Sequence, residues 1–373
     1  MRTKGTSGSL RLLAAAAVGV VLLGGCGTGA TTRTAQTPPP ASPARDSPPP
    51  GSAVPGTPRD LVTGLSVPWA IAFLPDKNAL VTERDTAHLL RVTPDGKRAD
   101  LGRIPGVDAS GEGGLLGVAV SPSFDRDHLV YLYLTSSTDN RLVRLTLDGD
   151  RLGAPQPLLT GVPKGENHNG GRIAFGPDGM IYISTGETYH RELAQDRNSL
   201  GGKILRVTPE GRPAPGNPFG SPVWTWGHRN VEGLAWDDAG RMYATEFGQD
   251  RFDEINLIQK GQNYGWPDVE GFGKDPRFTN PLLTWPVSEA SPSGLAYAKG
   301  SLWAGALRGT RLWQIPLKNG KVSTPIAYFN GTYGRLRAVV RSPDGDLWVT
   351  TSNKDGRGTP RDGDDRIIVI PLH

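Results

Sequence analysis

The stretch RIAFGPDG at residues 172–179, followed by IYIS at residues 181–184, carries the pattern that decides the fold. A short apolar run enters a turn rich in Gly, Pro and Asp, and a second apolar run follows at once, which predicts a β-hairpin. Six such pairs occur along the chain. The other five are AIAFLPD (70–76) with LVT (80–82), GVAVSP (117–122) with VYL (130–132), GLAWDD (233–238) with MYA (242–244), GLAY (294–297) with LWA (302–304), and AVVRSPDG (338–345) with LWV (347–349).

The spacing of these hairpins predicts a propeller. Successive copies begin roughly 45 to 60 residues apart, the length of a four-stranded blade with variable loops. Further apolar runs between the copies supply the additional strands, at residues 142–147, 203–207, 254–258 and 311–315. The 50 glycines and 33 prolines suit a chain full of turns. We therefore predict an all-β, six-bladed β-propeller of four-stranded antiparallel blades, closed by residues 366–370 and N-terminal sequence.

The N-terminus has the pattern of an export signal. Arg2, Lys4 and Arg11 precede an apolar run at residues 12–23, which is too short for a comfortable membrane span. The run ends in LGGC at residues 23–26, which resembles the bacterial lipobox. We predict a lipoprotein signal peptide over residues 1–25, lipidation of Cys26, and anchoring to the outer face of the bacterial cell membrane. An ordinary cleaved signal with an incidental cysteine is the alternative.

Composition divides the remainder into two parts. Residues 26–57 are rich in Pro, Ser and Thr with few apolar side chains, which predicts a disordered tether. Residues 58–373 are long enough for one large catalytic propeller domain. The formal net charge of +4 includes three cations in the first 11 residues, and no Lys/Arg run is present, so we expect no nucleic-acid partner. A monomer is the default, and Cys26 is the only cysteine.

The hairpin geometry also indicates where a site lies. The turn occupies one end of each hairpin, so the residues that precede the first strand and follow the second share the opposite end. Arg, His, Asn and acidic residues gather in these flanks: Glu112, His168, Arg229, Asn230, Arg308, Arg335 and Arg337. A ring of cations around one mouth of a propeller channel suggests an anionic, planar ligand held by charge-assisted hydrogen bonds.

At these residues the sequence resembles the soluble quinoprotein glucose dehydrogenase and aldose sugar dehydrogenase family, over nearly all of residues 61–373. The matching segments are VPWA (67–70), LVTER (80–84), GGLLG (113–117), ENHNGGR (166–172), LGGKILR (200–206), HRN (228–230), DEIN (253–256), NYGWP (263–267) and RLR (335–337). DEIN followed shortly by NYGWP is the most specific of them.

The resemblance implies an enzyme that uses pyrroloquinoline quinone (PQQ) and calcium to oxidise aldose sugars at C1 to lactones. It implies that His168 is the general base for hydride transfer to the quinone. Arg229 and Asn230 match the pair that faces the quinone oxygens. Arg308, Arg335 and Arg337 match the basic residues that bind the cofactor carboxylates, and Glu112 matches a further cofactor contact.

Calcium is expected at the backbone carbonyls of Gly248 and Gln249, although relatives often carry Pro at the second position. The electrons are expected to pass to an artificial or membrane-associated respiratory acceptor.

Two other interpretations of the sequence stay open. A propeller can merely bind a glycan or protein at the cell surface. A metal-dependent lactonase would need carboxylates converging on the channel, where this rim is dominated by Arg and Asn. A nicotinamide enzyme is disfavoured because no βαβ unit surrounds GEG at residues 111–113.

Overall fold

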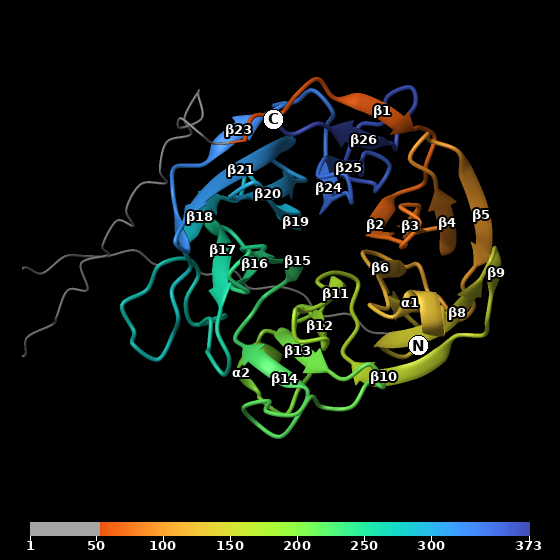
Figure 1. Ribbon diagram of the computed structural model, residues 1–373. Helices are drawn as coiled ribbons and strands as arrows, with labels where there is room; N and C mark the ends of the chain where they lie inside the picture. The colour runs from red at the N-terminus through yellow and green to blue at the C-terminus, as the bar shows by residue number, and fades with distance from the viewer. Residues whose placement is uncertain (1–52) are drawn as a thin grey trace, which may run out of the picture. The chain divides into compact units, whose positions relative to one another are not determined.

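The computed structural model describes residues 53–373, and they form a six-bladed β-propeller. Figure 1 looks along the propeller axis, with six sheets arranged around a central channel. Each sheet is antiparallel, and the first strand of each predicted hairpin lies innermost. The predicted fold class is confirmed. The three sheets that follow the N-terminus comprise β2 (Pro68–Phe73), β3 (Ala79–Glu83), β4 (His88–Val92) and β5 (Arg98–Arg103); β6 (Leu115–Val120), β7 (Leu129–Thr135), β8 (Asn140–Asp148), β9 (Arg151–Leu152) and β10 (Gln156–Val162); and β11 (Ile173–Phe175), β12 (Ile181–Ser184), β13 (Lys203–Val207) and β14 (Val223–Trp226).

The remaining three sheets complete the ring. They comprise β15 (Val231–Trp236), β16 (Met242–Glu246), β17 (Phe252–Ile258) and β18 (Leu283–Pro286); β19 (Pro292–Ala298), β20 (Ser301–Ala306), β21 (Arg311–Lys318), β22 (Lys321–Val322) and β23 (Ile326–Tyr328); and β24 (Leu336–Arg341), β25 (Leu347–Thr351), β26 (Ile367–Ile370) and β1 (Arg59–Val62). The described range contains two single-turn helices, α1 (Phe124–Asp127) and α2 (Glu192–Gln195), and no helix in it is long and apolar enough to cross a bilayer.

Two contacts join the first and last parts of the described chain. Strand β1 pairs with β26, as the sequence predicts, so the sixth blade combines both ends. Phe73 of the first blade also packs edge-on against Trp348 of the sixth, with ring centroids 5.0 Å apart. Because the ring is closed by a strand pair and an aromatic contact, no blade has to bury its face alone.

The boundary of the predicted tether needs a correction. Residues 53–57 fall in the range assigned to the tether, yet they lie along the C-terminus. The Val54 amide donates to the carbonyl of His373 at 3.2 Å, and the Gly56 amide donates to that of Pro371 at 2.7 Å. Ala53 is buried. These backbone bonds leave no trace in composition, so the sequence places the start of the folded part too late. Residues 1–52 lie outside the described range, and with them the predicted signal peptide, Cys26 and most of the tether.

The repeated turn explains why each hairpin forms where it does. Between β11 and β12 the Gly179 amide donates to the Gly176 carbonyl, and the Asp178 carboxylate accepts from the Met180 amide at 3.1 Å. Gly179 has φ of +74°, which a side chain would disfavour. The matching turn of the sixth blade has Gly345 in the same conformation. These turns all lie at one end of the propeller, and the functional flanks therefore lie at the other.

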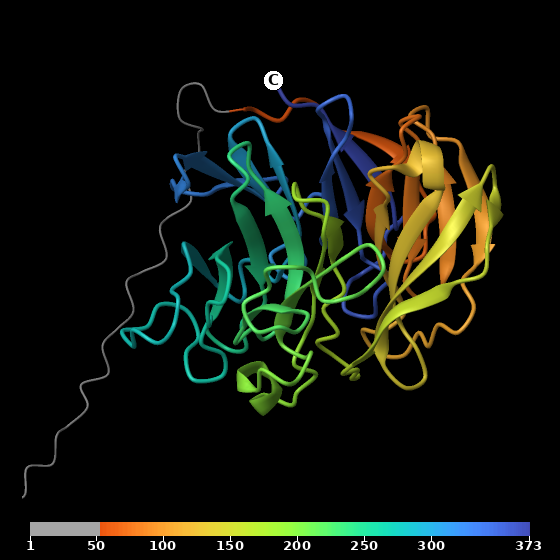
Figure 2. The same ribbon diagram turned by 60° about the horizontal axis from the view of Figure 1, so that its bottom comes forward.

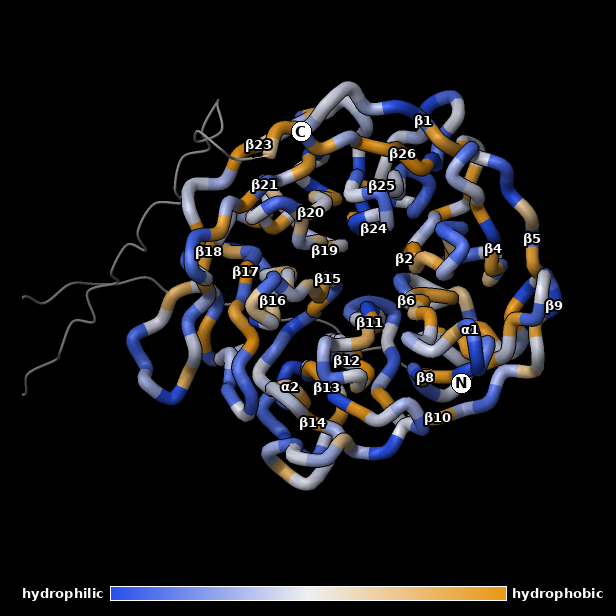
Figure 3. Tube along the Cα trace, viewed as in Figure 1, coloured by the Kyte–Doolittle hydropathy of each residue, from blue (hydrophilic) through white to orange (hydrophobic). Residues whose placement is uncertain are grey.

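The core fills the spaces between neighbouring blades. Apolar side chains cluster where adjacent sheets face each other, and the largest fully buried ones are aromatic: Trp69, Tyr131, Tyr133, Tyr243, Trp303 and Trp313. Figure 3 shows hydrophobic positions running along the blade strands, with hydrophilic segments on the connecting loops. This packing holds the loops at the opposite end on a rigid frame. Figure 2 shows these loops, with α2, projecting from that end.

Candidate functional site

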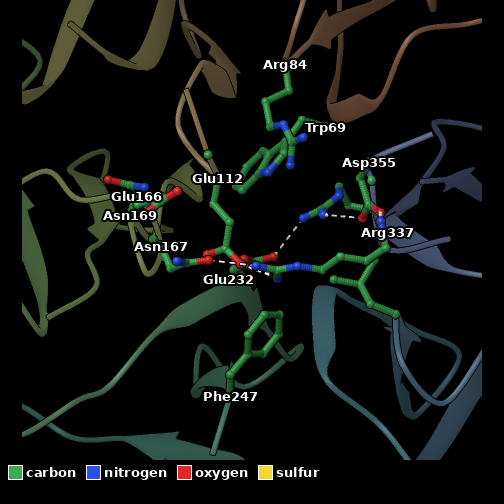
Figure 4. Close-up of a pocket in the computed structure, with 15 residues that line it drawn as sticks. Trp69, Arg84, Glu112, Glu166, Asn167, Asn169, Glu232, Phe247, Arg337 and Asp355 are labelled. Carbon is green, nitrogen blue, oxygen red and sulfur yellow. Dashed lines mark hydrogen bonds and ion pairs between the residues drawn. The ribbon is translucent and has the colours of Figure 1, made fainter. Parts of the chain in front are cut away.

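A cavity of about 300 Å³ lies at the predicted mouth of the channel. Figure 4 shows its wall, to which all six blades contribute. Trp69 and Phe247 supply aromatic surfaces, and Arg84, Arg337 and Arg357 supply guanidinium groups. Four carboxylates also line the cavity, those of Glu112, Glu166, Glu232 and Asp355. The flat aromatic walls suit a planar ligand, and the guanidinium groups are the candidate contacts for an anion. Of the predicted site residues, Glu112 and Arg337 line this cavity directly.

His168 lies between Asn167 and Asn169, which both line the cavity. Its Nδ1 is 2.5 Å from Oε1 of Glu187, and both side chains are buried. A carboxylate accepts, so Nδ1 carries the proton and Nε2 is left with a free lone pair. Within residues 53–373, no hydrogen bond is made to Nε2. Tyr189 covers the imidazole, with ring centroids 4.2 Å apart. The imidazole is therefore held in the tautomer that a general base requires.

Glu187 is the orienting carboxylate of this pair. Burial alone would raise its pKa, but the hydrogen bond from His168 and the nearby charge of Arg229 outweigh burial and lower the pKa. The carboxylate also accepts from the Tyr189 amide at 3.1 Å. Glu187 follows β12 and His168 precedes β11, so antiparallel pairing within the third blade brings the two together. Glu187 follows the second strand of its hairpin and so belongs to the flanks that form the rim, but the sequence did not indicate this role.

Glu112 connects the base to the second blade. Its Oε2 accepts from the His168 amide at 2.8 Å, and its Oε1 forms an ion pair with Arg357. Burial would raise the pKa of Glu112, but the charge of Arg357 and the bond from His168 lower it. The His168 backbone has φ of +57°, so this bond fixes a left-handed conformation that costs free energy for a residue with a side chain.

The predicted arginine pair is firmly held by carboxylates. Arg335 donates twice to Oδ2 of Asp355, at 3.0 and 2.8 Å. Arg337 reaches the same oxygen at 3.3 Å and Oε2 of Glu232 at 3.1 Å. Burial opposes ionisation of Asp355, but Arg337 and Arg335 outweigh burial and lower its pKa. Arg337 faces the cavity, whereas Arg335 lies behind Asp355 and lines a neighbouring one.

The structure separates Arg308 from the cavity. This exposed side chain lines the neighbouring cavity with Arg335 instead. Asn230 is fully buried, and its amide oxygen accepts from the Gly170 amide at 3.0 Å. Asn230 therefore holds the loop that carries His168. Arg229 lies beside the cavity wall, where Nη1 donates to the Phe247 carbonyl at 3.3 Å while its buried Nε has no partner within the described residues. Burial lowers the pKa of Arg229.

The predicted calcium loop is organised around Glu270. A single oxygen of this carboxylate accepts four consecutive backbone amides, those of residues 249–252, at 2.8 to 3.1 Å. Asp253 accepts from the Gly248 amide at 2.9 Å. No hydrogen bond within residues 53–373 reaches the carbonyl oxygens of Gly248 and Gln249, so both remain available to a cation. The same residues contain no group of three or more His, Cys, Asp or Glu side chains arranged for a metal.

Beyond Glu187, the cavity residues Glu232, Asp355 and Arg357 also take part in this site, although the sequence did not indicate them. Asp355 and Arg357 lie in the loop that follows β25, where the sequence pattern marks no single residue. Glu232 stands inside β15, where its neighbours are apolar. A charged residue within an otherwise buried strand is the signal that could have indicated it.

The chain is similar to known sugar dehydrogenases. An aldose sugar dehydrogenase from Streptomyces coelicolor, solved in its PQQ-bound form, is 53% identical with a TM-score of 0.85, over 87% of this chain and 100% of that one. The Escherichia coli aldose sugar dehydrogenase YliI is 32% identical over 78% of this chain and 89% of its own length. Quinoprotein glucose dehydrogenase B from Acinetobacter calcoaceticus is 34% identical over 58% of this chain and 53% of its own length.

These relatives place the chain among the propeller enzymes of the oxidoreductase class. Within that class it belongs to the glucose/sorbosone dehydrogenase family, whose sequence model matches residues 65–361.

Proposed function

We propose that this enzyme oxidises aldose sugars at C1 to lactones, with PQQ and calcium. The observation that carries the proposal is the buried His168–Glu187 pair at the edge of a cavity lined by arginines. Family membership favours this enzyme over a propeller that only binds a glycan or a protein.

The cavity residues fit the cofactor. PQQ is a flat tricarboxylate, and the cavity offers the faces of Trp69 and Phe247 with the guanidinium of Arg337. The Nε of Arg229 beside the wall has no partner among residues 53–373, so it is a buried donor that a ligand oxygen would satisfy. When bound, the quinone supplies the two-electron acceptor that protein side chains lack. Arg308 and Arg335 flank this cavity from behind, so they act on the electrostatic potential rather than by lining it.

The side chains have separate roles in the proposed reaction. His168 takes the proton of the C1 hydroxyl at Nε2, and Glu187 keeps Nδ1 protonated and stabilises the imidazolium that forms. Arg229 lies where it would stabilise developing negative charge. Asn230 and Glu112 fix the loop that carries the base. Calcium, held by the carbonyls of Gly248 and Gln249, would add a positive charge to the same site.

The test is reduction of an electron-accepting dye by the purified protein, supplied with PQQ, calcium and a panel of aldoses. Turnover that requires the quinone and stops with a calcium chelator supports the proposal. Folded protein that takes up no quinone and reduces no dye would transfer the assignment to a binding propeller.

We also propose export and anchoring by lipid on Cys26, with a membrane-associated electron acceptor and a monomeric enzyme. The support for anchoring is the LGGC pattern after the apolar run. Wild-type protein in the membrane fraction that incorporates radiolabelled palmitate, with a Cys26→Ser variant that does neither, is the expected result.

A further inference from the structure

The cavity carries almost no uncompensated positive charge, although its ligand is proposed to be an anion. Arg337 is paired with Glu232 and Asp355, Arg84 with Asp85, and Arg357 with Glu112. A polycarboxylate would therefore meet arginines that carboxylates already hold. One of these pairs has to open before any of the three arginines that line the cavity is free to bind it.

The pairs differ in how readily they can open. Arg337 has 5% of its side chain exposed and its partners 7% and 2%, so separating them leaves buried charges unpaired, which is strongly unfavourable. Arg357 has 56% of its side chain exposed, and solvent can rehydrate it as it leaves Glu112. Its partner Glu112 has 18% of its side chain exposed, so this pair is better solvated than the pairs of Arg337 and costs less to open. Arg357 is therefore the cation that can move.

Arg357 also spans the mouth of the cavity. It stands in the loop between β25 and β26 of the sixth blade, and its guanidinium reaches Glu112 before β6 and Oδ1 of Asn167 before β11. The second of these contacts measures 2.6 Å. One side chain thus joins the sixth blade to the second and third, and all three residues line the cavity.

The loop beneath this side chain is fixed. Asp365 accepts from the Asn353 amide at 2.6 Å, and the Asn353 side chain donates to Asp364 at 2.9 Å. Asp355 accepts from the Arg357 amide at 3.0 Å while it holds Arg335. Any movement at the mouth is therefore a change of side-chain conformation, with the backbone in place.

We propose that Arg357 is an anion-responsive gate: paired with Glu112 and Asn167 it closes the mouth, and a planar polycarboxylate in the cavity takes over its guanidinium. This deepens the proposed function, on which the identity of the natural ligand rests. The gate also reaches the base, because Glu112 holds the His168 amide with its second oxygen. Occupancy of the cavity and support of the His168 loop are thereby connected through one carboxylate.

The test measures quenching of tryptophan fluorescence in the full-length protein by PQQ and, separately, by benzene-1,3,5-tricarboxylate, a planar anion without redox chemistry. Arg357→Ala removes a charge-assisted contact and should weaken binding about tenfold, the equivalent of about 1.4 kcal/mol. Glu112→Gln frees Arg357 from its partner and should tighten binding up to about fivefold. Stopped-flow association should be faster in both variants.

The double variant separates the gate from simple repulsion by Glu112. If Glu112 acts through Arg357, then Glu112→Gln has no effect on affinity in the Arg357→Ala background. A tightening that persists there would overturn the gate. Arg361→Ala is the control, because Arg361 is in the same loop and donates to the backbone carbonyls of Thr332 and Gly331.

The two probes distinguish the proposals. A wild-type protein that binds the tricarboxylate but not PQQ would refute the proposed cofactor, while the variants still decide on the gate. A wild-type protein that binds neither probe would overturn both proposals.

Discussion

The His168–Glu187 pair allows a graded test of how the base is held. Its bond measures 2.5 Å, and 7% and 1% of the two side chains are exposed, so solvent cannot replace a lost partner. Glu187→Gln keeps an oxygen that can accept from Nδ1 and removes the negative charge. Glu187→Ala removes both, which leaves the tautomer of His168 unspecified.

The magnitudes follow from the type of bond. A hydrogen bond to a charged group contributes about 1.5 to 3 kcal/mol and a neutral one about 0.5 to 1.5 kcal/mol. Glu187→Gln, which loses only the charge, should therefore lower kcat about tenfold. Glu187→Ala, which loses the whole hydrogen bond, should lower kcat about ten- to a hundred-and-fifty-fold. Neither change touches the cavity wall, so affinity for PQQ should stay at the wild-type value.

The assay is steady-state dye reduction at saturating sugar, with PQQ affinity measured by fluorescence and folding checked by thermal unfolding. Glu192→Gln is the matched control, since Glu192 begins α2 shortly after Glu187 and has 75% of its side chain exposed. Wild-type kcat in both Glu187 variants would refute the assignment of this carboxylate as the residue that orients the base.

Other expectations follow from the same site. His168→Ala should retain PQQ binding and lose about 10²- to 10⁴-fold in kcat, measured in the dye assay; wild-type turnover would exclude it as the base. Arg335→Ala with Arg337→Ala should weaken PQQ binding in a fluorescence titration, and unchanged affinity would contradict their electrostatic role. Asp355 has a lowered pKa in the folded protein, so its stabilising contribution is present above about pH 4 and is lost as the pH falls through the folded pKa. Asp355→Asn should therefore lower thermal stability at pH 7 and flatten its decline below pH 4; a parallel decline in both proteins would contradict this. Chelation should abolish dye reduction and calcium should restore it, whereas activity that survives exhaustive chelation would exclude a calcium requirement.

The architecture could be predicted from the sequence because its signals are local and repeated. Gly179 and Gly345 mark equivalent turns that can be aligned in the sequence. Six copies of one hairpin are compatible with few folds. Closure was also predictable, since the apolar run at residues 366–370 needs a partner. The end of the propeller that carries the polar flanks was predictable from the same hairpin repeat. Residues 53–57 escaped prediction because backbone pairing with the C-terminus has no side-chain pattern.

The residue types of the site were likewise visible in the sequence, but their pairing was not. The repeat placed His168, Arg337 and Glu112 at one rim, and a family resemblance suggested their roles. Only the tertiary structure joins Glu187 to His168, sets Asp355 between two arginines, and brings Arg357 across to Glu112, 245 residues away in the chain. Composition and strand periodicity report on which face of a blade a residue occupies. The distance between charges on different blades depends on how the ring closes, and that distance decides which cation is locked and which can move.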